Sequence, residues 1–268
     1  MIEMKNLGTN RALWTITTVL ALLAAAFGGL CPGVYSKILA SNLIPGAYAQ
    51  DLLTIIICLV LLALIFSAKQ NDFKKQAVIL GVIGSFWYLY GIFSIERVYN
   101  LAYYLYLAIF STSSWTIAYS LASLETDLVA SISVPRMIRL ISAGFSLAIA
   151  ALFITLWVSA LYPLVSTGTK IEFLYSIYLL DLCFVMPAFI ITATLALRKH
   201  GLGILMTPTM FILGIFVIFP LGLGELAKPY YGLAPDNASM IMSFAFTGLF
   251  LIFTAMNLRY MKSVKSGQ

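Results

Sequence analysis

The stretch LLTIIICLVLLALIF at residues 52–66 decides the fold class of this chain. It is apolar almost without interruption and contains no charged side chain. A membrane-spanning β-strand needs apolar and polar residues that alternate over ~10 positions, and this stretch shows no such alternation. An α-helix of ~20 mostly apolar residues crosses the ~30 Å hydrocarbon layer of a bilayer. The stretch therefore predicts a membrane-spanning helix.

Similar apolar runs recur along the whole chain. Hydrophobic residues make up 62% of the 268 residues, charged residues make up 10%, and the mean hydropathy is +0.99. A soluble globular domain has a charged fraction of ~25%, so the composition excludes that class. We predict an all-α polytopic transmembrane helix bundle that occupies residues 1–268 as a single domain. The eight predicted spans lie near residues 12–30, 52–67, 76–94, 99–122, 139–162, 173–197, 203–222 and 238–258.

The basic residues predict the orientation in the membrane. With a cytoplasmic N-terminus, twelve of the 16 Lys and Arg residues fall in cytoplasmic loops, and the other four are Lys37, Arg97, Lys170 and Lys228. Basic residues concentrate in the cytoplasmic loops of membrane proteins, so both termini are predicted to be cytoplasmic. An odd number of spans would break the alternation of cytoplasmic and outer loops on which this count depends. The expected partner is the lipid bilayer, and the net charge of +6 reflects these loops rather than a surface for nucleic acid.

Asp181 is the sharpest candidate for a functional residue. It lies inside the sixth predicted span, about 13 Å from the outer end at ~1.5 Å per residue. A carboxylate at this depth costs at least ~2.5 kcal/mol, and such residues usually face the interior of the bundle. Pro187 in the same span can free the carbonyl of Cys183 as a further polar group. We expect Asp181 to bind a substrate or to form a buried structural pair, and Arg97 is the basic residue that could reach it from outside.

A polar turn joins the third and fourth predicted spans. It contains Glu96, Arg97 and Asn100, and Tyr103 falls on the same helical face as Glu96 and Asn100. These residues are candidates for the mouth of an outward-facing site, with interfacial anchoring and structural pairing as the alternative. Asp51 is the remaining candidate for substrate binding. At the start of the second predicted span it is also an ordinary helix cap.

Hydroxyl residues cluster at positions 111–116 in the fourth predicted span. In lipid, such residues form hydrogen bonds between helices and let them pack closely. We expect this cluster to bond to nearby backbone groups or across to another helix.

Several function classes lack their usual residues. His200 is the only histidine, and it falls in a cytoplasmic turn, so neither a haem site nor a histidine-based metal site is predicted. The HExxH and GxSxG patterns of proteases and hydrolases are absent. Cys31, Cys58 and Cys183 are an odd number at unrelated spacings and predict neither a disulfide framework nor a metal knuckle. No cofactor is predicted.

Three motifs carry a resemblance to a family. They are the pair Gln50–Asp51, the tyrosine-rich segments YLY and YNLAYYLYLAIFS at residues 88–90 and 99–111, and the segment Leu180, Asp181, Leu182 with Pro187. Together they resemble a broad family of uncharacterised prokaryotic polytopic membrane proteins, across most of spans two to seven. The chain departs from that pattern in the charged SIER at residues 94–97. The resemblance implies an integral protein of about eight helices, in a prokaryotic cell membrane, and implies no particular activity.

The leading functional hypothesis is an outward-facing polar cavity that binds or transports a small solute or cation. Asp181 would be its deep acid, with Glu96, Arg97, Asn100 and Tyr103 at the mouth and Asp51 nearby. An intramembrane enzyme for a lipid or isoprenoid substrate is the first alternative. A non-catalytic membrane subunit or sensor is the second.

Overall fold

The computed structural model describes residues 5–124, 132–171 and 174–263, and within these ranges the chain is almost entirely helical. The helices are α1 (Leu7–Leu30), α2 (Ile44–Ser67), α3 (Phe73–Ile95), α4 (Tyr103–Ala122), α6 (Arg136–Thr167), α7 (Tyr175–Leu180), α8 (Met186–Leu197), α9 (Gly201–Ala227) and α10 (Asn237–Tyr260). Two-residue strands, β1 (Ile132–Ser133) and β2 (Lys262–Ser263), pair antiparallel. The prediction of an all-helical fold is confirmed.

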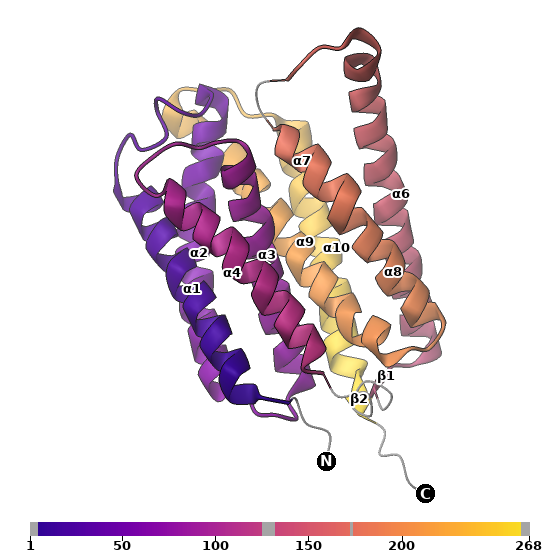
Figure 1. Ribbon diagram of the computed structural model, residues 1–268. Coiled ribbons are helices and arrows are strands. Elements are labelled where there is room, and N and C mark those ends of the chain that lie inside the picture. Colours follow the sequence, from indigo (N-terminus) through magenta and orange to yellow (C-terminus); the bar gives the residue numbers. More distant parts are fainter. Residues whose placement is uncertain (1–4, 125–131, 172–173, 264–268) are drawn as a thin grey trace, which may run out of the picture.

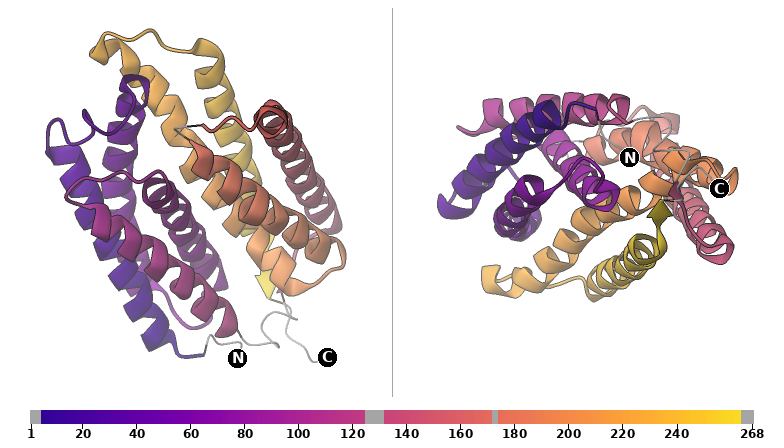
Figure 2. Two further views of the ribbon diagram at one scale, coloured as in Figure 1. Left: turned by 45° about the horizontal axis from the view of Figure 1, so that its top comes forward. Right: turned by 90° about the horizontal axis from the view of Figure 1, so that it is seen from below.

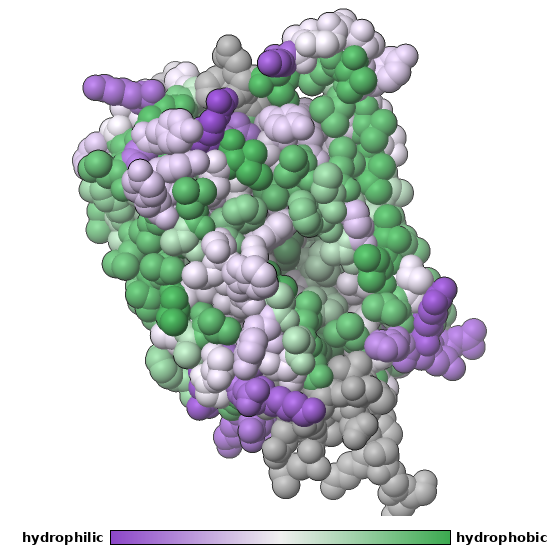
Figure 3. All heavy atoms as spheres, in the orientation of Figure 1, coloured by the Kyte–Doolittle hydropathy of each residue, from purple (hydrophilic) through white to green (hydrophobic). Residues whose placement is uncertain are grey.

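Seven helical segments of the described chain are long and apolar enough to cross a membrane. They are α1, α2, α3, α6, the segment from α7 to α8, α9 and α10. The helix α4 is not among them, because tyrosines and hydroxyl residues lower its hydropathy. Figure 3 shows the corresponding surface: charged residues gather at the two ends of the bundle, and apolar residues form the band between them.

The helices form two groups that meet at α3 and α9 (Figure 1). The first group contains α1 to α4, and the second contains α6 to α10, with α9 packed against α2, α3, α8 and α10. Figure 2 shows α9 running obliquely, with α2 and α3 on one side of it and α10 on the other. The helix α1 begins, and α10 ends, at the same end of the bundle. The opposite end of the bundle is named the far end.

Two glycines let α9 approach its neighbours closely. A methyl group added at Gly81 of α3 would lie 2.8 Å from the carbonyl oxygen of Thr209. A methyl group at Gly224 of α9 would lie 2.7 Å from the Cα of Gly46 in α2. Helices in lipid gain stability from such close contact, because the hydrophobic effect does not draw them together there.

Polar side chains join α4 to α1. The indole of Trp14 donates to Ser120 Oγ at 2.9 Å, and Ser120 Oγ donates to Asn10 Oδ1 at 2.8 Å. One turn away, the hydroxyls of Thr17 and Thr116 lie 3.1 Å apart. Within the predicted hydroxyl cluster, Thr116 thus bonds across to α1, whereas Thr112 and Ser114 donate to backbone carbonyls of α4 itself.

Helix boundaries differ most from the prediction at α2, which begins at Ile44 rather than at residue 52. Pro45 lies in the first turn, where its missing N–H costs no hydrogen bond. Asp51 consequently lies inside the helix and does not cap it. In the second group, α6 extends to Thr167 and α9 extends to Ala227, beyond the predicted ends at residues 162 and 222.

The sixth predicted span is interrupted by a π-helical segment, Asp181–Val185, between α7 and α8. The N–H of Met186 donates to the carbonyl of Asp181, five residues back. Pro187 follows directly and cannot donate, so one turn of the ladder is widened there. The predicted first residue of this span, 173, lies outside the described residues.

Candidate functional site

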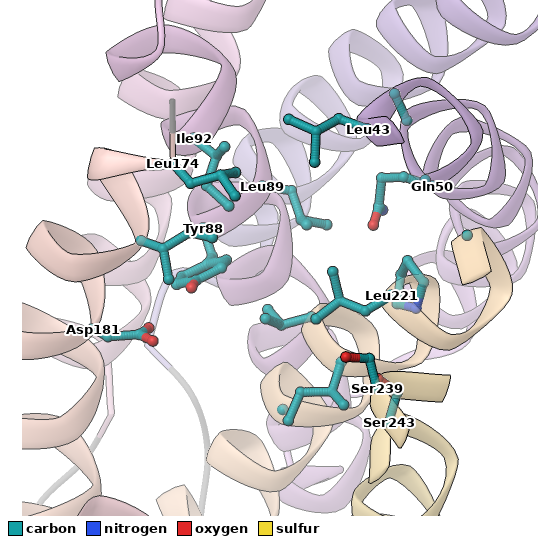
Figure 4. Close-up of a pocket in the computed structure, with 18 of the residues that line it drawn as sticks. Leu43, Gln50, Tyr88, Leu89, Ile92, Leu174, Asp181, Leu221, Ser239 and Ser243 are labelled. Atoms are coloured by element: carbon teal, nitrogen blue, oxygen red, sulfur yellow. The ribbon is translucent and has the colours of Figure 1, made fainter. Parts of the chain in front are cut away.

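A cavity of about 500 Å³ lies in the far half of the bundle, where the two helix groups meet. Its walls come from η1 (Ser41–Leu43), α2, α3, α6, α9 and α10, and from the chain between Leu174 and Phe189. Figure 4 shows residues of the first group and of the second facing one another across it.

Most of the lining is apolar. The apolar residues include Leu89, Phe153, Phe189, Leu213, Val217, Met242, Phe246 and Phe250. Ligand sites of this size usually combine such a lining with a few polar groups that fix orientation. Here the polar groups lie in the wall around Asp181, in the opposite wall at Gln50, on α10 at Ser239 and Ser243, and at the far rim.

Asp181 forms the polar part of the first wall, at the start of the π-helical segment. Its residue is 6% exposed, and its Oδ2 accepts a hydrogen bond from the Trp157 indole at 2.7 Å. The Tyr88 hydroxyl also interacts with this carboxyl group. An ionised carboxylate can accept about four hydrogen bonds, so these partners leave acceptor positions open toward the cavity. Figure 4 shows Asp181 and Tyr88 on the same side of the space.

Gln50 of α2 lies on the opposite wall. Its Nε2 donates to Thr54 Oγ1 at 2.9 Å, one turn along the same helix. Figure 4 shows its amide oxygen directed into the cavity. Both facing walls therefore present hydrogen-bond acceptors.

The far rim contains acids that are already bound to neighbours. Glu225 Oε1 accepts from Lys228 Nζ at 2.6 Å, and Oε2 accepts from the backbone N–H of Asp236 at 2.8 Å. Glu96 Oε1 accepts from the backbone N–H of Ser176 at 2.7 Å, in the first turn of α7. Carboxylates stabilise helix N-termini by binding these free N–H groups. The contacts observed for both acids are thus structural.

The remaining residues of the predicted mouth lie away from the cavity. Asn100 donates to the Tyr106 hydroxyl at 2.9 Å and accepts from the N–H of Ala102, which supports the turn before α4. The Tyr103 hydroxyl donates to the carbonyl of Ser94 at 3.1 Å. Arg97 is exposed, with a left-handed φ of 56°, and the described contacts of Asp181 do not include it.

Asp51 lies in the first helix group and does not line the cavity. Its residue is 2% exposed, and its Oδ2 accepts from the Tyr35 hydroxyl at 2.7 Å. Burial, followed by the charge of Asp51, raises the pKa of Tyr35 well above its usual value, so this phenol remains a donor. A methyl group at Gly28 of α1 would collide with both the carboxyl and the phenol. Asp51 is therefore held in a closely packed structural contact.

Of the six predicted site residues, the cavity brings together Asp181 and Glu96. The other groups around it, Trp157, Tyr88 and Gln50, were not among the predicted site residues. Tyr88 and Trp157 carry polar atoms inside long apolar runs, and this is the one feature of the sequence that points to them. In the sequence, Gln50 is distinguished only as part of the Gln50–Asp51 pair.

Among the residues that the structure describes, no group of three or more His, Cys, Asp and Glu side chains is arranged to hold a metal ion. Comparison of the chain with protein-family models, with curated proteins and with solved structures finds no match. The resemblance stated from the motifs therefore gains no family assignment.

Proposed function

We propose that this integral membrane protein binds, and moves across the membrane, a small solute that is a cation or carries a cationic group. One observation carries the proposal: the buried carboxyl of Asp181 lies on the wall of a cavity large enough for an organic molecule and keeps acceptor positions open. A carboxylate inside a membrane is costly unless it has partners. A cationic ligand would supply one.

The proposed arrangement has eight spans: the seven apolar segments and, in addition, α4, which packs beside α1 and α3. Polar contacts with α1 support this, since they satisfy hydroxyls of α4 that lipid could not. Twelve of the 16 basic residues then fall on the cytoplasmic side with both termini, which supports an opening of the cavity to the outside. The prokaryotic cell membrane is the proposed location, on the resemblance of the motifs.

Two hydrophobic ions of similar shape and opposite charge test the recognition step. In lipid nanodiscs, we expect tetraphenylphosphonium to raise the Tm of the protein and tetraphenylborate to leave it unchanged. Binding to the folded state stabilises by RT ln(1 + [L]/Kd), so the shift should grow with concentration. Asp181→Asn should abolish the shift, and Asp51→Asn should keep it. Equal shifts in the native protein and in Asp181→Asn would contradict the proposal.

Movement across the membrane needs a probe that crosses lipid slowly. We expect proteoliposomes to accumulate radiolabelled tetraethylammonium faster than liposomes that contain the Asp181→Asn variant. Binding without any difference in accumulation would reduce the proposal to a binding protein.

A further inference from the structure

Resting on the proposed function, we infer that the ligand is a membrane-dissolved amphiphile, with a cationic or hydrogen-bond-donating head and an apolar body, that reaches Asp181 sideways between α6 and α10. Three features of the cavity support this: its lining, the contacts between these two helices, and the signs of the charges around it.

The lining favours a ligand with a large apolar part. A bare divalent cation takes about six or more oxygen ligands, and a small hydrophilic solute needs a partner for each of its polar groups. Apart from Asp181, Tyr88, Trp157 and Gln50, and from Asn42, Ser239 and Ser243 nearer the far end, the walls consist mainly of aromatic and aliphatic side chains such as Phe189 and Phe250. These walls match an apolar body placed beyond a polar head.

The hydrogen bonds and ring contacts between α6 and α10 end part of the way toward the far end. Near the end of the bundle where α10 ends, Asn257 Nδ2 donates to Ser142 Oγ at 2.8 Å. The rings of Phe145 and Phe253 stack there with their centroids 4.3 Å apart. The last aromatic contact joins Phe153 and Phe246, with ring centroids 6.1 Å apart. Beyond that pair, in the described chain, no hydrogen bond or ring contact connects the two helices.

Both helices continue to line the cavity beyond the Phe153–Phe246 ring contact, through Trp157 of α6 and Met242 of α10. Met242 is 54% exposed although it lines the cavity. The two helices are inclined to each other in the view along the bundle (Figure 2). The cavity is therefore inferred to open sideways between these helices, at a level that the proposed orientation places among acyl chains.

The charged and hydrogen-bonding groups that line the cavity favour one kind of head group. Acceptors face the cavity from both walls, at Asp181 and Gln50. Lys228 is the one basic residue on the described lining, and it is paired with Glu225 at 2.6 Å. A phosphate head would find no free cation here, whereas an ammonium or a hydroxyl head would find acceptors. An amphiphile that carries an amine thus fits better than an anionic lipid.

A chain-length series tests the amphiphile. The probes are tetramethylammonium and dodecyltrimethylammonium, used below its micelle concentration, with Tm measured in nanodiscs of one lipid composition. We expect apparent affinity for the long-chain ion to exceed that for tetramethylammonium by more than about tenfold, because each buried CH₂ adds favourable transfer energy. The Asp181→Asn variant in the same nanodiscs corrects for partition into lipid.

The outcomes separate the two proposals. If both ions bind equally well and both depend on Asp181, the amphiphile is wrong and the proposed function stands. If neither shift depends on Asp181, the proposed function fails. A long-chain ion that binds in an Asp181-dependent manner while tetramethylammonium does not supports both.

Spin labels test the side opening. In a variant with Cys31, Cys58 and Cys183 replaced, a nitroxide is placed at Met242→Cys, and at Ile241→Cys as the matched control. Ile241 is 65% exposed, adjacent in sequence, and does not line the cavity. We expect dodecyltrimethylammonium to slow the motion of the label at 242 and to leave the label at 241 unchanged. The same response at both positions would overturn the side opening.

Discussion

Asp51 and Asp181 are two buried carboxyl groups in two halves of one bundle, and they have different surroundings. Each accepts a hydrogen bond at 2.7 Å from an aromatic side chain, Tyr35 or Trp157. Asp51 is closed in by Gly28 and lies outside the cavity, whereas Asp181 lies on the cavity wall. Burial and an aromatic donor are therefore common to both carboxyl groups. Contact with the cavity is what distinguishes Asp181 from Asp51.

The largest effect that separates the two halves is expected at Gly28. Gly28→Ala would bring a methyl group into the carboxyl of Asp51 and the phenol of Tyr35. Overpacking of this kind costs typically ~1–3 kcal/mol, and here it also breaks a buried hydrogen bond. We expect a sharp loss of folded yield and of Tm in detergent.

Gly29→Ala is the matched control for that experiment. The nearest atom to its methyl group would be Cβ of Asp51 at 3.6 Å, an ordinary contact. Alanine is the better helix former by roughly 0.5–1 kcal/mol, so this variant should be as stable as the native protein or more so. Equal stability of the two variants would show that Asp51 is not closely packed.

The second effect is expected when the aromatic donor of each aspartate is removed: stability should fall at Asp51, and ligand affinity should fall at Asp181. Tyr35→Phe leaves the buried carboxyl of Asp51 without its donor, which costs about 1–3 kcal/mol, and should not change the affinity for tetraphenylphosphonium. Trp157→Phe removes a donor from Asp181, where molecules in the cavity can replace it. Its stability should change less, and its affinity should change more. Unfolding titrations and Tm shifts in nanodiscs measure the two quantities.

The opposite pattern would exchange the roles of the two carboxyl groups. If Tyr35→Phe lowered ligand affinity while Trp157→Phe lowered only stability, Asp51 would be the binding residue. The contrast drawn between the two halves would then be wrong.

The smallest effect is expected at Asp236, an exposed aspartate that provides a reference for the buried ones. It caps α10, and hydrogen bonds from Ser239, followed by that from the Ala238 N–H, hold its pKa below the usual value of 3.8. Because the folded-state pKa is the lower one, its stabilisation is complete above the unfolded pKa and is lost as pH falls through the folded pKa. Asp236→Asn should remove this acid dependence from Tm and leave binding unchanged. An unchanged acid profile would contradict the cap.

Much of the fold follows from the sequence, since long apolar runs leave the backbone no partner in lipid except its own helix. The start of α2 could not be predicted, because a Pro–Gly pair usually marks a turn, whereas Pro45 and Gly46 here occupy the first turn of the helix. Depth along the chain identified Asp181 as a candidate. Its donor Trp157 lies 24 positions earlier in another helix, and no local pattern relates them.

The contact between α1 and α4 also has a consequence for biosynthesis. Its hydrogen-bonded pairs are 99 to 110 positions apart in the chain, so α1 is made long before its partner. In the proposed eight-span arrangement, Ser120 and Thr116 enter the membrane before they meet their partners on α1, and the carbonyl one turn back in α4 can serve them until then, as it serves Ser114 and Ser123 in the folded chain. The polar face of α4 is therefore completed only when the fourth helix packs on the first.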